Sequence, residues 1–200
     1  MGATINTQEG LMSTLKMDRS TLWEVSSRTI VYAAIGAALY GVLGLFSFLL
    51  PGTQNVTVRP AFALVTFFGY GFGPIVGLFT GFVGNAIIDQ IQGSGFLTYW
   101  NWSLANGLAG LVAGLAPLYL GSMMTGPISR RALGGAIAGA VASVVGFLFV
   151  FSDIWVGGSS FNAIVTGSYI PVVVADVIAA VILTPILVYA WEPVKDQLGR

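Results

Sequence analysis

A few polar side chains interrupt apolar stretches of the sequence where hydrocarbon would not tolerate them. Asp176 stands seven residues after Tyr169, which begins the last apolar run. Asp89 and Asn85 are four residues apart, so a helix would place them on one face, and Asn106 lies inside another apolar run. A charge at mid-membrane costs about 2.5–3.5 kcal/mol and is usually paired or lines a cavity. These residues therefore indicate a polar site inside an apolar fold.

Further amide, carboxylate and aromatic side chains fall near the same ends of the apolar runs. A pocket walled by indoles with a few polar groups suits a small flat heterocycle. Carboxylates would hold an amine or a protonated ring through hydrogen bonds or charge. The sequence therefore predicts a pocket for a small molecule. Its candidate residues are Asn55, Arg59, Asn85, Asp89, Trp100, Asn101, Trp102, Asn106, Asp153, Trp155, Tyr169 and Asp176.

Two of these assignments have alternatives. Trp and Tyr also gather at membrane interfaces simply as anchors, which would account for part of the aromatic set. Arg59 either forms a structural ion pair with Asp89 or Asp176, or holds an acidic or carbonyl group of the ligand.

Two side-chain types that many enzymes use are missing. The 200 residues include no Cys and no His, which removes thiolate nucleophiles, imidazole acid–base chemistry and the commonest zinc ligands. A site of carboxylates alone could hold a metal, but we predict no metal and no cofactor. No G-x-x-x-x-G-K-[ST] run is present, so ATP hydrolysis of that kind is not expected of this chain. We therefore expect a binding protein and not an enzyme.

The composition places this site in a membrane protein. Hydrophobic residues make up 56% of the chain and charged residues 8%, with a mean hydropathy of +0.85. A soluble domain has about 25% charged residues. Eight basic and eight acidic residues cancel, so no nucleic-acid partner is indicated. The sequence predicts an all-α integral membrane protein.

Six apolar runs predict a bundle of six transmembrane helices, because about 20 apolar residues cross the hydrocarbon core. The predicted spans are 29–50, 56–72, 74–91, 103–120, 132–151 and 169–191. The second run is short and contains glycine near its end. Pro171 falls in the first turn of the last span, where proline is tolerated, and Pro185 should bend its inner end.

Basic residues orient the bundle. With both termini in the cytoplasm, only Arg59 lies outside. The basic residues inside are Lys16, Arg19, Arg28, Arg130, Arg131, Lys195 and Arg200. This asymmetry follows the positive-inside rule and favours an even number of spans.

The segment before the first span is expected to be an N-terminal tail over residues 1–20, disordered or leading into the first helix, and not a cleaved signal peptide. Thr21 and Glu24 have capping-box spacing, which predicts a short amphipathic helix along the membrane surface. One membrane domain over residues 21–192 follows, and residues 193–200 form a cytoplasmic tail.

Small residues recur at four-residue spacing, which lets helices approach closely in lipid. We interpret several sets as internal packing surfaces: Gly69, Gly73, Gly77 and Gly81; Gly110 and Gly114; Gly135 and Gly139. Ala33, Ala37 and Gly41 form a stripe along the first span. That stripe serves either internal packing or a groove for the helix of a partner protein.

Three stretches resemble a known family. They are TIVYAAIGAALYGVLG, RPAFALVTFFGYGFGPIVGLFTGFVGNAIIDQI and YWNWSLANGLAGLVAGL. They are similar to the substrate-binding S component of energy-coupling-factor (ECF) transporters, near the riboflavin-type branch. The resemblance covers about residues 25–190, and the segment from Arg59 to Asp89 is its most specific part.

The resemblance implies six helices with cytoplasmic termini, surrounded by lipid in the plasma membrane of a bacterial-type cell. It implies a vitamin-like or heterocyclic micronutrient bound from the outer side. Its implied partners are a transmembrane coupling subunit and two ATPase subunits, which make the S component topple and release its ligand inside. The family's AxxxA motif, which docks on the coupling subunit, matches Ala33 and Ala37 and continues to Gly41.

The substrate does not carry over, because members share a fold better than they share pocket residues. Related S components take riboflavin, thiamine or its pyrimidine precursor, cobalamin, methionine-related compounds or queuosine precursors. Two other functions make different predictions. A self-sufficient carrier or channel would work without a coupling ATPase, and a membrane enzyme using Asp89, Asp153 or Asp176 would convert its ligand.

Overall fold

The computed structural model describes residues 22–53 and 56–197, and most of their regular structure is helical. The longer helices in these ranges are α2 (Ser27–Leu43), α3 (Phe62–Phe72), α4 (Pro74–Ile91), α5 (Trp100–Gly114), α7 (Ile128–Gly146) and α10 (Ile170–Gln197). Shorter elements join them: β1 (Phe48–Leu49), β2 (Thr57–Val58), α6 (Ala116–Tyr119), η2 (Gly121–Met123), η3 (Phe147–Ser152), α8 (Asp153–Val156), α9 (Phe161–Ile164) and η4 (Val165–Tyr169). The predicted all-α class is confirmed.

Three helical stretches of the described chain are long and apolar enough to cross a membrane. They are Pro74–Ile91, Ile128–Val156 and Phe161–Lys195. The helices Ser27–Leu43 and Phe62–Phe72 are apolar but shorter. The prediction of a membrane protein is therefore supported by the helices, whereas the number of six spans stays a prediction.

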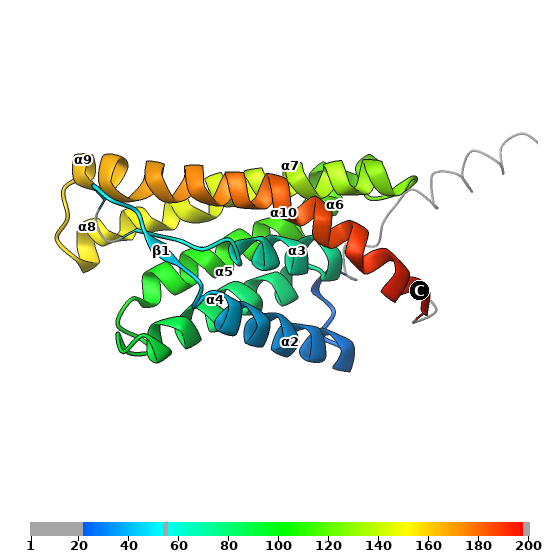
Figure 1. The fold of residues 1–200 in the computed structure, drawn as a ribbon, viewed down its shortest axis with the longest axis horizontal. Helices are drawn as coiled ribbons and strands as arrows, with labels where there is room; N and C mark the ends of the chain where they lie inside the picture. Colours follow the sequence, from blue (N-terminus) through cyan, green and yellow to red (C-terminus); the bar gives the residue numbers. More distant parts are fainter. Residues whose placement is uncertain (1–21, 54–55, 198–200) are drawn as a thin grey trace, which may run out of the picture.

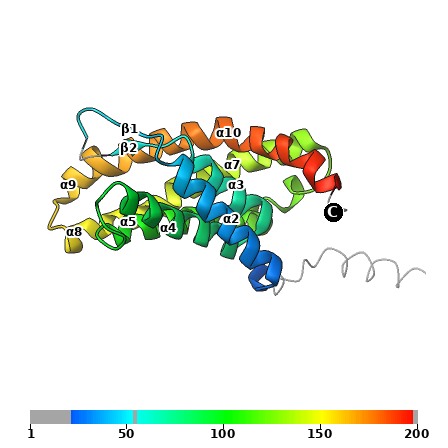
Figure 2. The same cartoon turned by 60° about the horizontal axis from the view of Figure 1, so that its bottom comes forward.

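The long helices form an elongated bundle. In Figure 1, α7 and α10 lie along one edge, α2 lies along the opposite edge, and α3, α4 and α5 lie between them. The closest neighbours are α4 with α5, α2 with α4, and α7 with α10. The start of α2 and the end of α10 lie toward one end of the molecule, here called the terminal end (Figures 1 and 2). The β1–β2 hairpin, α8 and α9 lie at the other, here called the hairpin end.

The segment between the first two long helices differs from the prediction. The first helix was expected to reach Leu50, but α2 ends at Leu43, and β1 pairs antiparallel with β2. Gly52 turns the chain with a φ of 77°, and β-branched residues favour the returning strand. The second helix was expected from Val56 but begins at Phe62, after this strand. A hydropathy count cannot separate a short apolar strand from the end of a helix.

The other helices follow the predicted runs with shifted ends. Helix α4 covers the predicted residues, and α5 starts three residues before the predicted Ser103. The last run begins earlier than predicted, because α9 and the π-helical turn η4 lead into α10. Pro185 lies inside α10, which changes direction toward its C-terminal end (Figure 1).

The start of the chain can be compared with its prediction only in part. Residues 1–20 and Thr21 lie outside the described residues, so the predicted tail and capping box do as well. Leu22 and Trp23 lie in a 3₁₀ turn. The capping box that is present belongs to Ser26 and Thr29 at the start of α2, where the Thr29 N–H donates to Ser26 Oγ over 3.3 Å.

Glycine lets α4 and α5 touch backbone to backbone. A Cβ added at Gly77 would overlap the carbonyl oxygen of Gly110, and one at Gly110 would overlap the carbonyl oxygen of Gly77. Gly73 makes the turn between α3 and α4 with a φ of 102°, a conformation that favours glycine. The interpretation of these glycines as internal packing residues is confirmed for the α4–α5 pair.

The stripe predicted to dock on a coupling subunit faces inward. Ala33 is 8% exposed and Ala37 5% exposed, and a Cβ at Gly41 would lie 2.9 Å from the Ile87 side chain of α4. This burial agrees with the alternative of internal packing against α4, and contact of these three residues with a partner stays a prediction. The exposed alanines of α2 are Ala34 and Ala38.

Candidate ligand-binding site

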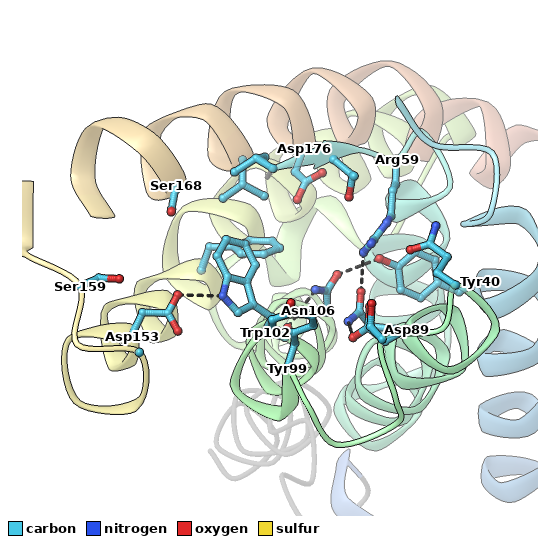
Figure 3. Close-up of a pocket in the computed structure, with 18 residues that line it drawn as sticks. Tyr40, Arg59, Asp89, Tyr99, Trp102, Asn106, Asp153, Ser159, Ser168 and Asp176 are labelled. Atoms are coloured by element: carbon cyan, nitrogen blue, oxygen red, sulfur yellow. Dashed lines mark hydrogen bonds between the residues drawn. The ribbon is translucent and has the colours of Figure 1, made fainter. Parts of the chain in front are cut away.

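A cavity of about 460 Å³ opens at the hairpin end, where residues from both halves of the chain meet (Figure 3). Its wall is built by α2, the hairpin, α4, α5, the η3–α8 segment and the start of α10. The lining residues are Tyr40, Val56, Thr57, Arg59, Asn85, Asp89, Gln92, Ser94, Tyr99, Trp102, Asn106, Phe147, Asp153, Gly157, Ser159, Ser168, Val172 and Asp176.

An amide bridges the cation and one carboxylate on the α4 side of the cavity. Arg59, directly after β2, donates from Nη1 to Oδ1 of Asn85 over 2.6 Å. Asn85 donates from Nδ2 to Asp89 and to Ser103, both over 3.0 Å. The four-residue spacing of Asn85 and Asp89 on α4 makes this arrangement possible. Arg59 is therefore linked to Asp89 through the amide of Asn85, and it forms no direct ion pair within the described chain.

A second carboxylate fixes an indole ring. Trp102 donates from Nε1 to Oδ2 of Asp153 over 2.8 Å, and Asn101 donates from Nδ2 to Oδ1 of Asp153 over 2.6 Å. Asn101 also donates to Ser152 over 3.0 Å and is 1% exposed. These bonds tie the start of α5 to the η3–α8 segment. The indole of Trp102 is thereby held in the wall of the cavity (Figure 3).

A buried hydrogen bond closes the cavity toward α2. The hydroxyl of Tyr40 donates to Oδ1 of Asn106 over 2.8 Å, and Asn106 donates from Nδ2 to the carbonyl of Trp102 over 2.9 Å. Tyr40 was not among the predicted site residues. The sequence does contain a signal for Tyr40: its hydroxyl is a polar group within an apolar run, as is the amide of Asn106.

Asp176 differs from the other carboxylates of the cavity. Its side chain projects from α10 toward the cavity (Figure 3) and is 5% exposed. Within residues 22–53 and 56–197, no side chain or N–H group donates a hydrogen bond to it and no basic group forms an ion pair with it. A buried carboxylate without a donor is costly, so this position calls for a donor from outside the described chain.

The structure brings most of the predicted residues together. Those that line the cavity are Arg59, Asn85, Asp89, Trp102, Asn106, Asp153 and Asp176. Asn101 contributes from behind the wall, through Asp153. Asn55 lies outside the described residues.

Three predicted aromatic residues lie elsewhere. Trp155 is 81% exposed. Trp100 packs edge-on against Phe149, with ring centroids 6.4 Å apart. Tyr169 donates its hydroxyl to the carbonyl of Val144 over 2.9 Å. None of the three lines the cavity, which agrees with the alternative that they serve as membrane anchors.

The arrangement suits binding. It offers amide and carboxylate groups at fixed positions and aromatic walls from Tyr99, Trp102 and Phe147. Such a combination orients a polar aromatic molecule by hydrogen bonds and covers its faces with apolar surface.

Comparisons with known proteins point to one family. The family described as "ECF-type riboflavin transporter, S component" matches residues 24–192. A UPF0397 protein of Vibrio atlanticus (strain LGP32) is 44% identical over 93 residues. This alignment covers 46% of the chain and 50% of the relative, so the chain spans about half the length of the curated relative that it matches. No solved structure matches the chain.

Proposed function

Since the chain belongs to the family of S components of ECF-type riboflavin transporters, we propose that it captures a vitamin-like or heterocyclic micronutrient for an ATP-driven importer. The family match confirms the resemblance found in the sequence, and the family consists of transporter subunits and not of enzymes. The observation that carries the proposal is the cavity at the hairpin end, with its polar groups and fixed indole.

The proposed topology has six spans in the plasma membrane, with both termini inside the cell. Its spans are built on α2, α3, α4, α5, α7 and α10. Two observations support it. The start of α2 and the end of α10 lie at the same end of the molecule (Figures 1 and 2). Among the described basic residues, Arg59 alone belongs to the hairpin end, and the others begin α2 and α7 or end α10. The cavity then opens outward.

The proposed partners are a transmembrane coupling subunit and two ATPase subunits, on which the chain topples to release its ligand inside. The contact is placed on the outer face of α2 in this proposal, because its small residues Ala34 and Ala38 are exposed. The exposed apolar side chains Ile30, Ile35 and Val42 surround them. Small residues flanked by apolar ones let a partner helix approach closely in lipid.

One uptake experiment tests the proposal. The molecule that co-purifies with the detergent-solubilised chain is identified by mass spectrometry, and its radiolabelled form is offered to cells. We expect uptake when the chain is expressed with a coupling subunit and two ATPases, and none with the chain alone. Uptake by the chain alone would favour a self-sufficient carrier, and chemical conversion of the molecule would favour an enzyme.

Two tryptophan substitutions test the coupling contact in the same assay. Ala38→Trp is expected to abolish uptake and co-purification of the coupling subunit while the ligand still binds. Ala190→Trp, at an exposed alanine of α10, is the matched control and should leave both unchanged. Equal uptake by the two variants would show that the coupling subunit does not contact this face of α2.

A further inference from the structure

The three carboxylates that line the cavity are not equivalent. Asp153 accepts hydrogen bonds from Trp102 and Asn101, so both of its oxygens have donors. Asp89 accepts from Asn85, which in turn accepts from Arg59. The negative charge of Asp89 is therefore matched by the guanidinium through one amide.

Asp176 has no such bridge: Arg59 acts on it electrostatically, but no hydrogen bond joins the two side chains in the described chain. Arg59 is the one basic residue among the described residues that line the cavity, against three carboxylates. Asp176 is 5% exposed, faces the cavity, and receives no hydrogen bond from the described chain. Burying an ionised carboxylate is costly unless a donor or a cation accompanies it. A molecule bound in the cavity can supply that donor, because Asp176 lines the cavity.

The opposite wall fits a flat cation. The Trp102 indole is held by Asp153, and Tyr99 and Phe147 add further aromatic surface. A cation over an indole face gains electrostatic attraction in addition to apolar contact. An anionic group such as a phosphate ester would instead meet an excess of carboxylates. The cavity therefore distinguishes ligands by charge as well as by shape.

We propose that this site selects a flat nitrogen heterocycle bearing a positive charge, whose cationic N–H group hydrogen bonds to Asp176 while its ring packs on Trp102. The inference rests on the proposed function, since it names the class of molecule that the S component captures. It makes Asp176 the residue that determines charge specificity.

The test compares two probes of nearly the same shape. 4-Aminoquinoline is a cation at neutral pH, and quinoline is neutral. Isothermal titration calorimetry on the full chain in detergent should show that the cation binds about tenfold more tightly, as expected for one charge-assisted hydrogen bond. Asp176→Asn should remove this preference. Glu24→Gln, which removes an exposed carboxylate outside the cavity, should keep it.

Each outcome bears on the proposal. Equal affinity for the two probes, no binding of either probe to the wild-type chain, or a preference kept in Asp176→Asn would overturn it. Thermal unfolding shows that the variant is folded, and its unfolding temperature without ligand should rise, because a buried carboxylate without a donor has been removed. The comparison of the two probes on the wild-type chain does not depend on the folding of any variant.

The charge of the natural ligand separates this inference from the proposed function. If the co-purified molecule is neutral or anionic at neutral pH and is still imported with the coupling subunits, the charge inference fails and the proposed function stands. If no molecule is imported with the coupling subunits present, the proposed function itself fails, whatever the two probes show.

Discussion

Asp153 shows how one side chain positions another in this cavity. It lies in the first turn of α8 and accepts from both Trp102 and Asn101, two residues of the first turn of α5. The carboxylate therefore joins elements about fifty residues apart in the sequence. It also sets the plane of the indole, which a lone Trp side chain would leave free to rotate.

Trp102 and Trp155 make a matched pair for testing the role of the indole. Trp102→Ala is expected to weaken binding of 4-aminoquinoline about tenfold, because the ring contact with the cation is lost. Trp155→Ala should leave the affinity unchanged, since Trp155 is 81% exposed and does not line the cavity. Calorimetric titration of both variants decides this, and similar losses in the two would mean that the probe binds elsewhere.

At this scale the sequence predicted the polar half of the site better than the aromatic half. Asn85, Asp89, Asn106 and Asp176 were found because a polar group in an apolar run must be satisfied somewhere in the fold. Tyr40 was missed because a hydropathy count treats its ring as apolar and ignores its hydroxyl. Predicted aromatic residues such as Trp155 do not line the cavity, since sequence does not show which side of a short helix faces it.

The pair of helices α4 and α5 carries much of the cavity wall. Asn85 and Asp89 project from α4, and Trp102 and Asn106 project from α5. The distance between the two helices is set by the contact of Gly77 with Gly110, where neither residue has room for a Cβ. A change in this contact would displace one half of the wall from the other.

Gly110→Ala is expected to destabilise the folded chain by about 1–3 kcal/mol, because the added methyl overlaps the backbone of α4 and a packed interior tolerates extra volume poorly. Gly71→Ala is the control, since a Cβ at Gly71 has nothing within 4 Å. It should be neutral or slightly stabilising, as alanine favours helix more than glycine does. Thermal unfolding in detergent measures both, and equal unfolding temperatures for the two variants would refute the tight contact.

The elements themselves were predictable where an apolar run ends in a strong breaker. Helix α4 begins at Pro74 after Gly73, and its predicted and observed ranges agree. The prediction of helix failed between Leu43 and Phe62. Pairing of β1 with β2 depends on residues that only the tertiary fold brings together. The sequence likewise could not show that Ala33 and Ala37 face inward, since α2 has small residues on more than one face.

The whole molecule is polarised along its long axis. The cavity and the hairpin occupy one end, and Arg28, Arg130, Arg131 and Lys195 lie in the first or last turns of helices at the other. In the proposed topology, the basic end faces the cytoplasm and the cavity opens outward. The position of the cavity thereby agrees with capture of a ligand from outside the cell.

Single cysteines test this orientation, since the natural chain has none. Thr98→Cys, in the exposed turn before α5, should react with a membrane-impermeant thiol reagent in intact cells. Ser129→Cys, exposed at the start of α7, should react only after the cells are permeabilised. Mass spectrometry of the labelled protein reads out both positions. The reverse labelling pattern would invert the topology, and labelling of both in intact cells would contradict the single span predicted between the two sites.

The contact of Gly77 with Gly110 also bears on the thermodynamics of capture. Two helices that touch through their backbones have little freedom to slide or rotate against each other, so the side chains that they carry arrive already oriented. The conformational entropy of ordering Asn85, Asp89, Trp102 and Asn106 is then lost during folding and not when the ligand arrives. A scarce nutrient can then be bound tightly through few contacts, because little conformational entropy is lost in the receptor on binding.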